Sequence, residues 1–131
     1  TTHHPGDQAK RLIGNIAAEI ITPEEIKGKI IGGFENHGGR THLGPKMKPF
    51  ARVKRGFGNN GEDGYEGAVY KNAIGCYFHG PLLPKNPFIA TWLLTRALAV
   101  KYGSEVELEP LDDTFENRAH AAILKRLRIW N

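Results

Sequence analysis

The stretch GCYFHGPLLPKNP, residues 75–87, decides the fold, because it holds the end of a strand, a stiff turn and the start of a helix. Apolar residues lead to a lone histidine, His79, and the Gly-Pro pair at residues 80–81 ends the strand. Asn86 stands at the N-cap of a helix whose first residue is Pro87. In open α/β sheets the carboxyl end of a strand borders the active-site crevice, where a histidine can act as general acid or base. Taken alone, these residues fit a histidine with a purely structural role at least as well as a catalytic one.

Outward from this stretch, apolar and polar residues alternate in short runs that predict strands. The predicted strands span residues 11–21, 29–35, 50–57, 67–71 and 74–79. Their closeness in sequence favours antiparallel pairing for some of them.

Two helices are predicted after the strands. The first begins at Pro87 and ends at Gly103, and the second begins at Asp113, where Glu116 suggests a capping box. Their predicted buried stripes are Ile89, Trp92, Leu93, Ala97 and Val100 in the first, and Phe115, Ala119, Ala122, Ile123 and Leu127 in the second. The predicted fold class is α/β, with a mixed sheet of about five strands followed by two helices.

The bulk composition narrows the class of protein. The chain has 131 residues, enough for one domain or part of one, and 40% of them are hydrophobic. No run approaches the roughly 18 apolar residues of a membrane span, and the polar start does not read as a signal peptide. The single cysteine, Cys76, excludes an internal disulfide and favours the cytoplasm. Because Thr1 is not Met, we expect a processed or partial chain.

Several local motifs favour plain structural readings. The string GFGNNG at residues 56–61 matches a dinucleotide-binding fingerprint, but no helix signal follows it, so we expect a hairpin loop. Basic residues at 46–55 leave a non-catalytic RNA-binding module open as an alternative, although the aromatic residues that stack bases are missing. The histidine spacings predict no metal site. Cys76 and His79 would point to opposite faces of one strand, so Cys76 reads as a small buried residue.

Three strings together resemble a known family. They are RLIGN at residues 11–15, GGFENHGGRT at residues 32–41 and the stretch at residues 75–87. In this order they resemble the CobB/CobQ-like class I glutamine amidotransferases, and most of all the GatD-type glutaminase subunits of bacterial lipid II isoglutaminyl synthase. The resemblance implies the C-terminal part of a flavodoxin-like domain, with helices on both faces of its sheet in the intact protein.

The resemblance also implies roles for particular residues. In the family a cysteine thiolate attacks the side-chain amide of glutamine, and a histidine, matched here by His79, assists it. Arg11 matches an arginine linked to glutamine recognition, and a guanidinium suits the α-carboxylate. Asn36, His37 and Arg40 match the family signature and are expected to shape the site rim or the partner surface. Asn36 and His37 are expected, with Arg11, to bind the substrate. Pro81 stands where many class I amidotransferases have a glutamate.

The chain departs from the family in one large respect, since no string resembling the family's CGGYQ nucleophile elbow occurs in it. The resemblance implies that the nucleophile-bearing half is absent, that residues 1–131 alone are inactive, and that the exposed edges favour a homodimer. It implies no cofactor in this subunit, since the expected partner, a Mur-ligase-like synthetase of the MurT type, uses the ATP and Mg²⁺. We expect no nucleic-acid partner. The alternative within the family is a cobyric-acid-type amidotransferase domain.

Overall fold

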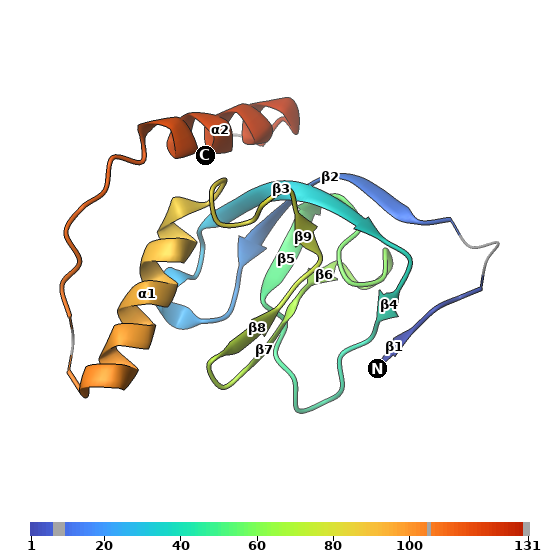
Figure 1. Ribbon diagram of the computed structural model, residues 1–131. Coiled ribbons are helices and arrows are strands. Elements are labelled where there is room, and N and C mark those ends of the chain that lie inside the picture. The colour runs from blue at the N-terminus through green and yellow to red at the C-terminus, as the bar shows by residue number, and fades with distance from the viewer. Residues whose placement is uncertain (7–9, 105, 130–131) are drawn as a thin grey trace.

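In the computed structural model, which describes residues 1–6, 10–104 and 106–129, the chain forms a curled antiparallel sheet with two helices (Figure 1). The strand order across the sheet is β6 (Tyr65–Glu66), β5 (Ala51–Arg55), β2 (Leu12–Ile20), β3 (Ile30–His37) and β9 (Phe78–His79). The predicted α/β class, with a five-stranded sheet followed by two helices, is confirmed. The prediction that the sheet is mixed was wrong, because every pairing of described strands is antiparallel.

The long pair β2–β3 forms the centre of the sheet, with Leu12 opposite His37 and Glu19 opposite Ile30. Since successive side chains on a strand point to opposite faces of the sheet, this register determines which residues lie on each face. One face is the core face, where Ile16 and Ile31 are fully buried. The core is completed by Ile20, Phe50, Phe78, Ile89 and, from the 3₁₀ turn η1 (Glu24–Ile26), Ile26.

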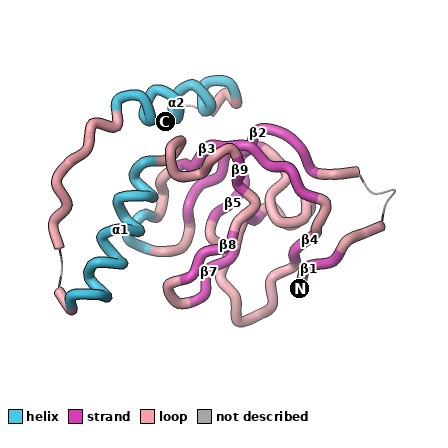
Figure 2. The backbone as a smooth tube through the Cα atoms, viewed as in Figure 1, coloured by secondary structure: helices cyan, strands magenta, loops and turns pink. Residues whose placement is uncertain are grey.

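Two small antiparallel pairs lie beside the main sheet (Figure 2). They are β1 (Thr2–His3) with β4 (Arg40–Thr41), and β7 (Ala68–Tyr70) with β8 (Ala73–Gly75). The prediction of a single strand at residues 74–79 was wrong, because β8 and β9 belong to different sheets. The chain leaves strand geometry between them, where the N–H of Tyr77 donates to the side chain of Glu66 instead of to a neighbouring strand.

Helix α1 (Pro87–Tyr102) begins after Asn86 and ends at Gly103, whose φ of 70° gives the predicted left-handed C-cap. The Asn86 side chain, however, does not cap the helix. Its Oδ1 accepts the N–H of Gly32 at 2.9 Å, and its Nδ2 donates to the carbonyls of Gly32 at 3.0 Å and Leu82 at 2.7 Å. Asn86 thus ties the start of α1 to β3 in the way a neighbouring strand would.

The predicted stripe of α1 holds only in its first half. Ile89 is buried and Trp92 is half-buried, whereas Ala97 and Val100 are exposed. No helix in the described ranges is both long and apolar enough to cross a membrane.

Helix α2 (Thr114–Arg126) starts after Asp113 as predicted, but the capping box does not form. The Asp112 carboxylate accepts the N–H of Thr114 at 3.1 Å instead. The predicted stripe holds only near the end of the helix. Phe115, Ala119 and Ala122 are exposed, whereas Ile123 and Leu127 are half-buried, and the buried residue is Leu124, which was not predicted. The reason is that α2 lies over β3 (Figure 1) and packs on it near its C-terminal end, where the side chains of Ile123 and Leu124 approach Gly32.

We predict that Asn86→Asp destabilises the protein. A carboxylate would replace two N–H donors with an acceptor facing two carbonyls in a fully buried place. The expected loss of unfolding free energy is about 2–4 kcal/mol, measured by urea unfolding. Asn72→Asp is the matched control, since Asn72 is exposed and offers only its Oδ1, to Arg96. Equal stability of the two variants would contradict this account of Asn86.

Candidate functional site

His79 lies on β9, at an outer edge of the main sheet, and its side chain is exposed. It pairs with Phe34 of β3 and is followed by Gly80, whose φ of 72° turns the chain away from the strand. The structure therefore places the ring at the surface and outside the hydrophobic core. The ring is accessible because β9 is an edge strand. The expectation that active sites lie at the carboxyl ends of parallel strands does not apply here, since β9 is antiparallel to β3.

Arg11 and Asn36 lie together at the adjoining end of β2 and β3. The Nε of Arg11 donates to Oδ1 of Asn36 at 3.0 Å, and its Nη2 donates to the carbonyl of Asn36 at 3.1 Å. Both residues are exposed. Two bonds to one residue fix the plane of the guanidinium while leaving further N–H groups available to an anion.

The strand register puts these predicted residues on one face. Phe34 and Asn36 are two positions apart on β3, so their side chains point to the same side, roughly 7 Å apart along the strand. His79 lies directly opposite Phe34 and shares its side. This surface, which we call the open face, therefore holds His79 and the Arg11–Asn36 pair. It is opposite the core face, and α2 packs on it at Gly32.

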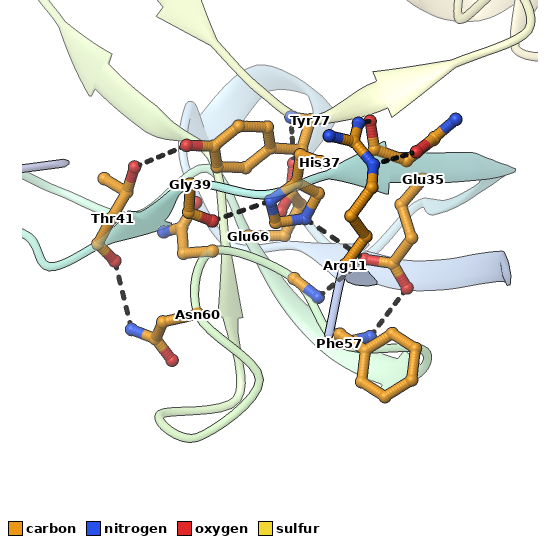
Figure 3. Close-up of polar contacts among 12 residues, drawn as sticks. Arg11, Glu35, His37, Gly39, Thr41, Phe57, Asn60, Glu66 and Tyr77 are labelled. Atoms are coloured by element: carbon orange, nitrogen blue, oxygen red, sulfur yellow. Dashed lines mark hydrogen bonds and ion pairs between the residues drawn. The ribbon is translucent and has the colours of Figure 1, made fainter. Parts of the chain in front are cut away.

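His37 is placed apart from the other predicted residues, since its ring is buried on the core face. Its Nδ1 lies 2.9 Å from the carbonyl of Gly39, and it stacks on Tyr77 with ring centroids 3.7 Å apart (Figure 3). Arg40, the other signature residue, donates to the carbonyls of Gly38, Gly39 and Lys10. These contacts organise the loop after β3.

Glu35 is a fully buried carboxylate that the sequence argument missed. It accepts the N–H of Phe57 at 2.7 Å and of Gly58 at 3.0 Å, and its Oε2 lies 3.7 Å from Nε2 of His37. Burial raises the pKa of Glu35, while the two N–H donors oppose that rise. The glycine-rich loop therefore binds a carboxylate of its own chain and joins β5 to β6, which confirms the hairpin reading.

Glu66 is a second buried carboxylate, and it lies on β6. Its Oε1 accepts the N–H of Tyr77 at 2.5 Å, and its Oε2 has no hydrogen-bond partner among the described residues. Burial raises the pKa of Glu66 from 4.5 to about 7, and the nearby Glu35 charge adds to the rise. A sequence signal existed for Glu35 and His37, because both occupy core positions in the alternation of β3.

Cys76 is half-buried and lies between β8 and β9, so the prediction of a buried strand residue was wrong in both respects. Burial raises the pKa of its thiol, which opposes formation of a thiolate. No hydrogen bond joins it to His79 among the described residues. The cysteine present is thus poorly suited to act as the nucleophile.

Comparison with known proteins gives consistent matches. Residues 4–87 match the CobB/CobQ-like glutamine amidotransferase domain. The chain is 49% identical over 81 residues to the lipid II isoglutaminyl synthase (glutamine-hydrolyzing) subunit GatD of Streptococcus pneumoniae, covering 62% of this chain and 31% of that protein. The Staphylococcus aureus subunit of the same name is 40% identical over 111 residues, which is 85% of this chain and 44% of that protein.

A more distant relative is a probable cobyric acid synthase of Methanothermobacter thermautotrophicus. It is 42% identical over 90 residues, which is 69% of this chain and 17% of that protein. The chain therefore spans less than half the length of each of these relatives.

The buried Glu66 predicts a stability that depends on pH. Its pKa is about 7 in the folded protein and 4.5 when unperturbed, so the folded state holds the proton more tightly. The contribution to stability is complete below pH 4.5 and is lost as the pH rises through 7, by an amount of about 3 kcal/mol. Urea unfolding from pH 5 to 8 should show this fall.

Glu66→Gln should flatten the pH dependence and leave the smaller slope due to Glu35, whose pKa is also raised. Glu62→Gln, at an exposed position in the preceding loop, is the control and should follow the wild type. Parallel curves for wild type and Glu66→Gln would show that Glu66 does not titrate with folding.

Proposed function

Because this chain belongs to the CobB/CobQ-like glutamine amidotransferase family, we propose that it provides the histidine part of a glutaminase site. In this proposal His79 is the catalytic histidine, and a cysteine from sequence outside this chain is the nucleophile. The observation that carries the proposal is the open face, on which an accessible histidine and a fixed guanidinium lie on the same side of the sheet.

The chemistry follows the family reaction. The cysteine thiolate attacks the side-chain amide carbon of glutamine, and the C–N bond breaks to leave a thioester. The departing nitrogen takes a proton from the His79 imidazolium and leaves as ammonia. The neutral imidazole then removes a proton from a water molecule, whose oxygen attacks the thioester, so that glutamate and the free thiol are released.

Arg11 is proposed to bind the α-carboxylate of glutamine. A guanidinium pairs with a carboxylate through two parallel bonds, and Asn36 already holds two of its N–H groups in place. Asn36 therefore orients the arginine in this proposal. In this proposal His37, which is buried on the core face, does not touch the substrate. It stacks on Tyr77, which lies two residues before His79.

The two relatives with the GatD name support lipid II as the acceptor. We propose that the whole protein works in the cytoplasm with a Mur-ligase-like synthetase, which uses ATP and Mg²⁺. The ammonia would amidate the D-glutamate of the lipid II stem peptide to D-isoglutamine. A cobyric-acid-type acceptor is the second candidate, favoured by the 42% identity to the probable cobyric acid synthase. Supplying the synthetase with lipid II or with a corrinoid acid, and identifying the amidated product, separates the two.

His79→Ala in the full-length protein, assayed with its synthetase, should lower kcat for ammonia release from glutamine by at least about 100-fold. The reason is the loss of the proton donor to the leaving nitrogen. His42→Ala is the matched control, since His42 is also an exposed histidine but lies on the loop after β4. Ammonia release that is unchanged in His79→Ala would refute the assigned role.

Arg11→Lys should raise the KM for glutamine by about 10-fold or more, because lysine keeps the charge but loses the planar pair of donors. The value of kcat should change less than KM, since the α-carboxylate is remote from the reacting amide. Arg55→Lys, at the exposed end of β5, serves as the control. An unaltered KM in Arg11→Lys removes Arg11 from the glutamine site.

A further inference from the structure

Tyr77 lies two residues before His79 and is fixed by three different contacts (Figure 3). Its backbone N–H donates to Glu66, and its hydroxyl lies 2.8 Å from the hydroxyl of Thr41. Its ring stacks on that of His37 with an angle of 7° between the ring planes. Backbone, ring and hydroxyl are therefore all held by parts of the chain that lie far from Tyr77 in sequence.

His79 depends on this anchor for its position. Strand β9 has two residues and pairs on one side only, with Phe34 and Glu35 of β3. No hydrogen bond fixes the His79 ring among the described residues, and the ring is exposed. Its direction is therefore set by the backbone of this segment, which is held by β3 along one side, by Lys85 at the carbonyl of Gly80 and by Tyr77 at its start.

The acceptor that holds Tyr77 is itself rigid. Glu66 is paired with Ala51 of β5, and the next residue, Gly67, is held on both sides by the Asn59 side chain. Asn59 accepts the N–H of Gly67 at 2.8 Å and donates to its carbonyl at 3.1 Å. The backbone around Glu66 is thus fixed, and the carboxylate of Glu66 is fully buried.

Stability alone does not explain a glutamate at this position. One of its oxygens is buried without a partner among the described residues, and the Glu35 charge is close enough to disfavour its ionisation. A buried carboxylate of this kind costs free energy that an apolar side chain of similar length would not. What glutamate supplies, and an apolar residue cannot, is an oxygen acceptor for the N–H of Tyr77.

We propose that Glu66 is a positioning residue for His79, which it orients by accepting the backbone N–H of Tyr77 and so fixing the start of β9. This inference rests on the proposed function, since it presumes that His79 is the catalytic histidine. It adds a residue on β6, at the opposite edge of the sheet, to the set that determines turnover.

The test compares Glu66→Met with Glu66→Gln in the full-length protein with its synthetase. Methionine keeps the length and removes the acceptor, so kcat for ammonia release should fall by about 10- to 100-fold while the KM for glutamine stays within about twofold. Glutamine keeps an oxygen acceptor, so kcat should stay within about threefold of the wild type. Glu62→Met is the control and should leave both constants unchanged.

Thermal unfolding of each variant separates positioning from a purely structural role. If Glu66 only supported the fold, a folded Glu66→Met protein would keep its kcat, and that result would overturn the proposal. Should Glu66→Met not fold, Glu66→Gln still decides. A loss in kcat above 10-fold in that variant contradicts the proposal, and a retained kcat supports it.

The His79→Ala variant in the same assay separates a failure of the positioning role of Glu66 from a failure of the proposed function. If His79→Ala abolishes ammonia release while folded Glu66→Met does not lower kcat, the positioning role fails and the proposed function stands. If His79→Ala leaves ammonia release intact, the proposed function fails, and the positioning role with it.

Discussion

The antiparallel register of β2 and β3 is the constraint on which the rest of the structure depends. Pairing Leu12 with His37 sends Glu35, His37 and Ile31 to the core face, and sends Phe34 and Asn36 to the open face. A slip of one residue would exchange the two sets, burying Asn36 and exposing Glu35. The chemistry assigned to the open face and the hydrogen bonds beneath it are therefore consequences of one pairing.

The two faces do different work. The open face presents His79 and the guanidinium of Arg11. The core face carries a polar network at one end, where Glu35 holds the glycine-rich loop and Glu66 holds Tyr77. Because buried polar groups are costly unless they are paired, this network fixes the loops and the edge strand more strictly than apolar packing would. The buried residues of the core face thus help to orient the exposed residues of the open face.

The sequence predicted the long elements and missed what depends on distant partners. The central strands and the ends of α1 follow from local signals, such as the alternation of β2 and Gly103 at the C-cap. The break between Gly75 and Phe78 could not be predicted, because its cause is a hydrogen bond to Glu66, eleven residues away. The burial pattern of α2 could not be predicted from its periodicity, because the helix is held by distant partners: Ile123 and Leu124 pack on Gly32, and Nδ1 of His120 lies 2.8 Å from the carbonyl of Lys85.

The same division applies to the site. His79, Arg11 and Asn36 were found through resemblance, and the structure adds that they share a face. His37 comes from the same string as Asn36 and yet lies on the other side, because neighbouring residues on a strand point in opposite directions. Glu66 was missed because nothing in its local sequence distinguishes a buried glutamate from an exposed one.

The central claim is that the open face is where glutamine reacts. Its most direct test is the structure of the full-length protein after reaction with a glutamine analogue that alkylates the nucleophilic cysteine. The account predicts a ring nitrogen of His79 within about 4 Å of the modified sulfur and the analogue's carboxylate paired with Arg11. An analogue bound away from the open face, with His79 directed elsewhere, would contradict it.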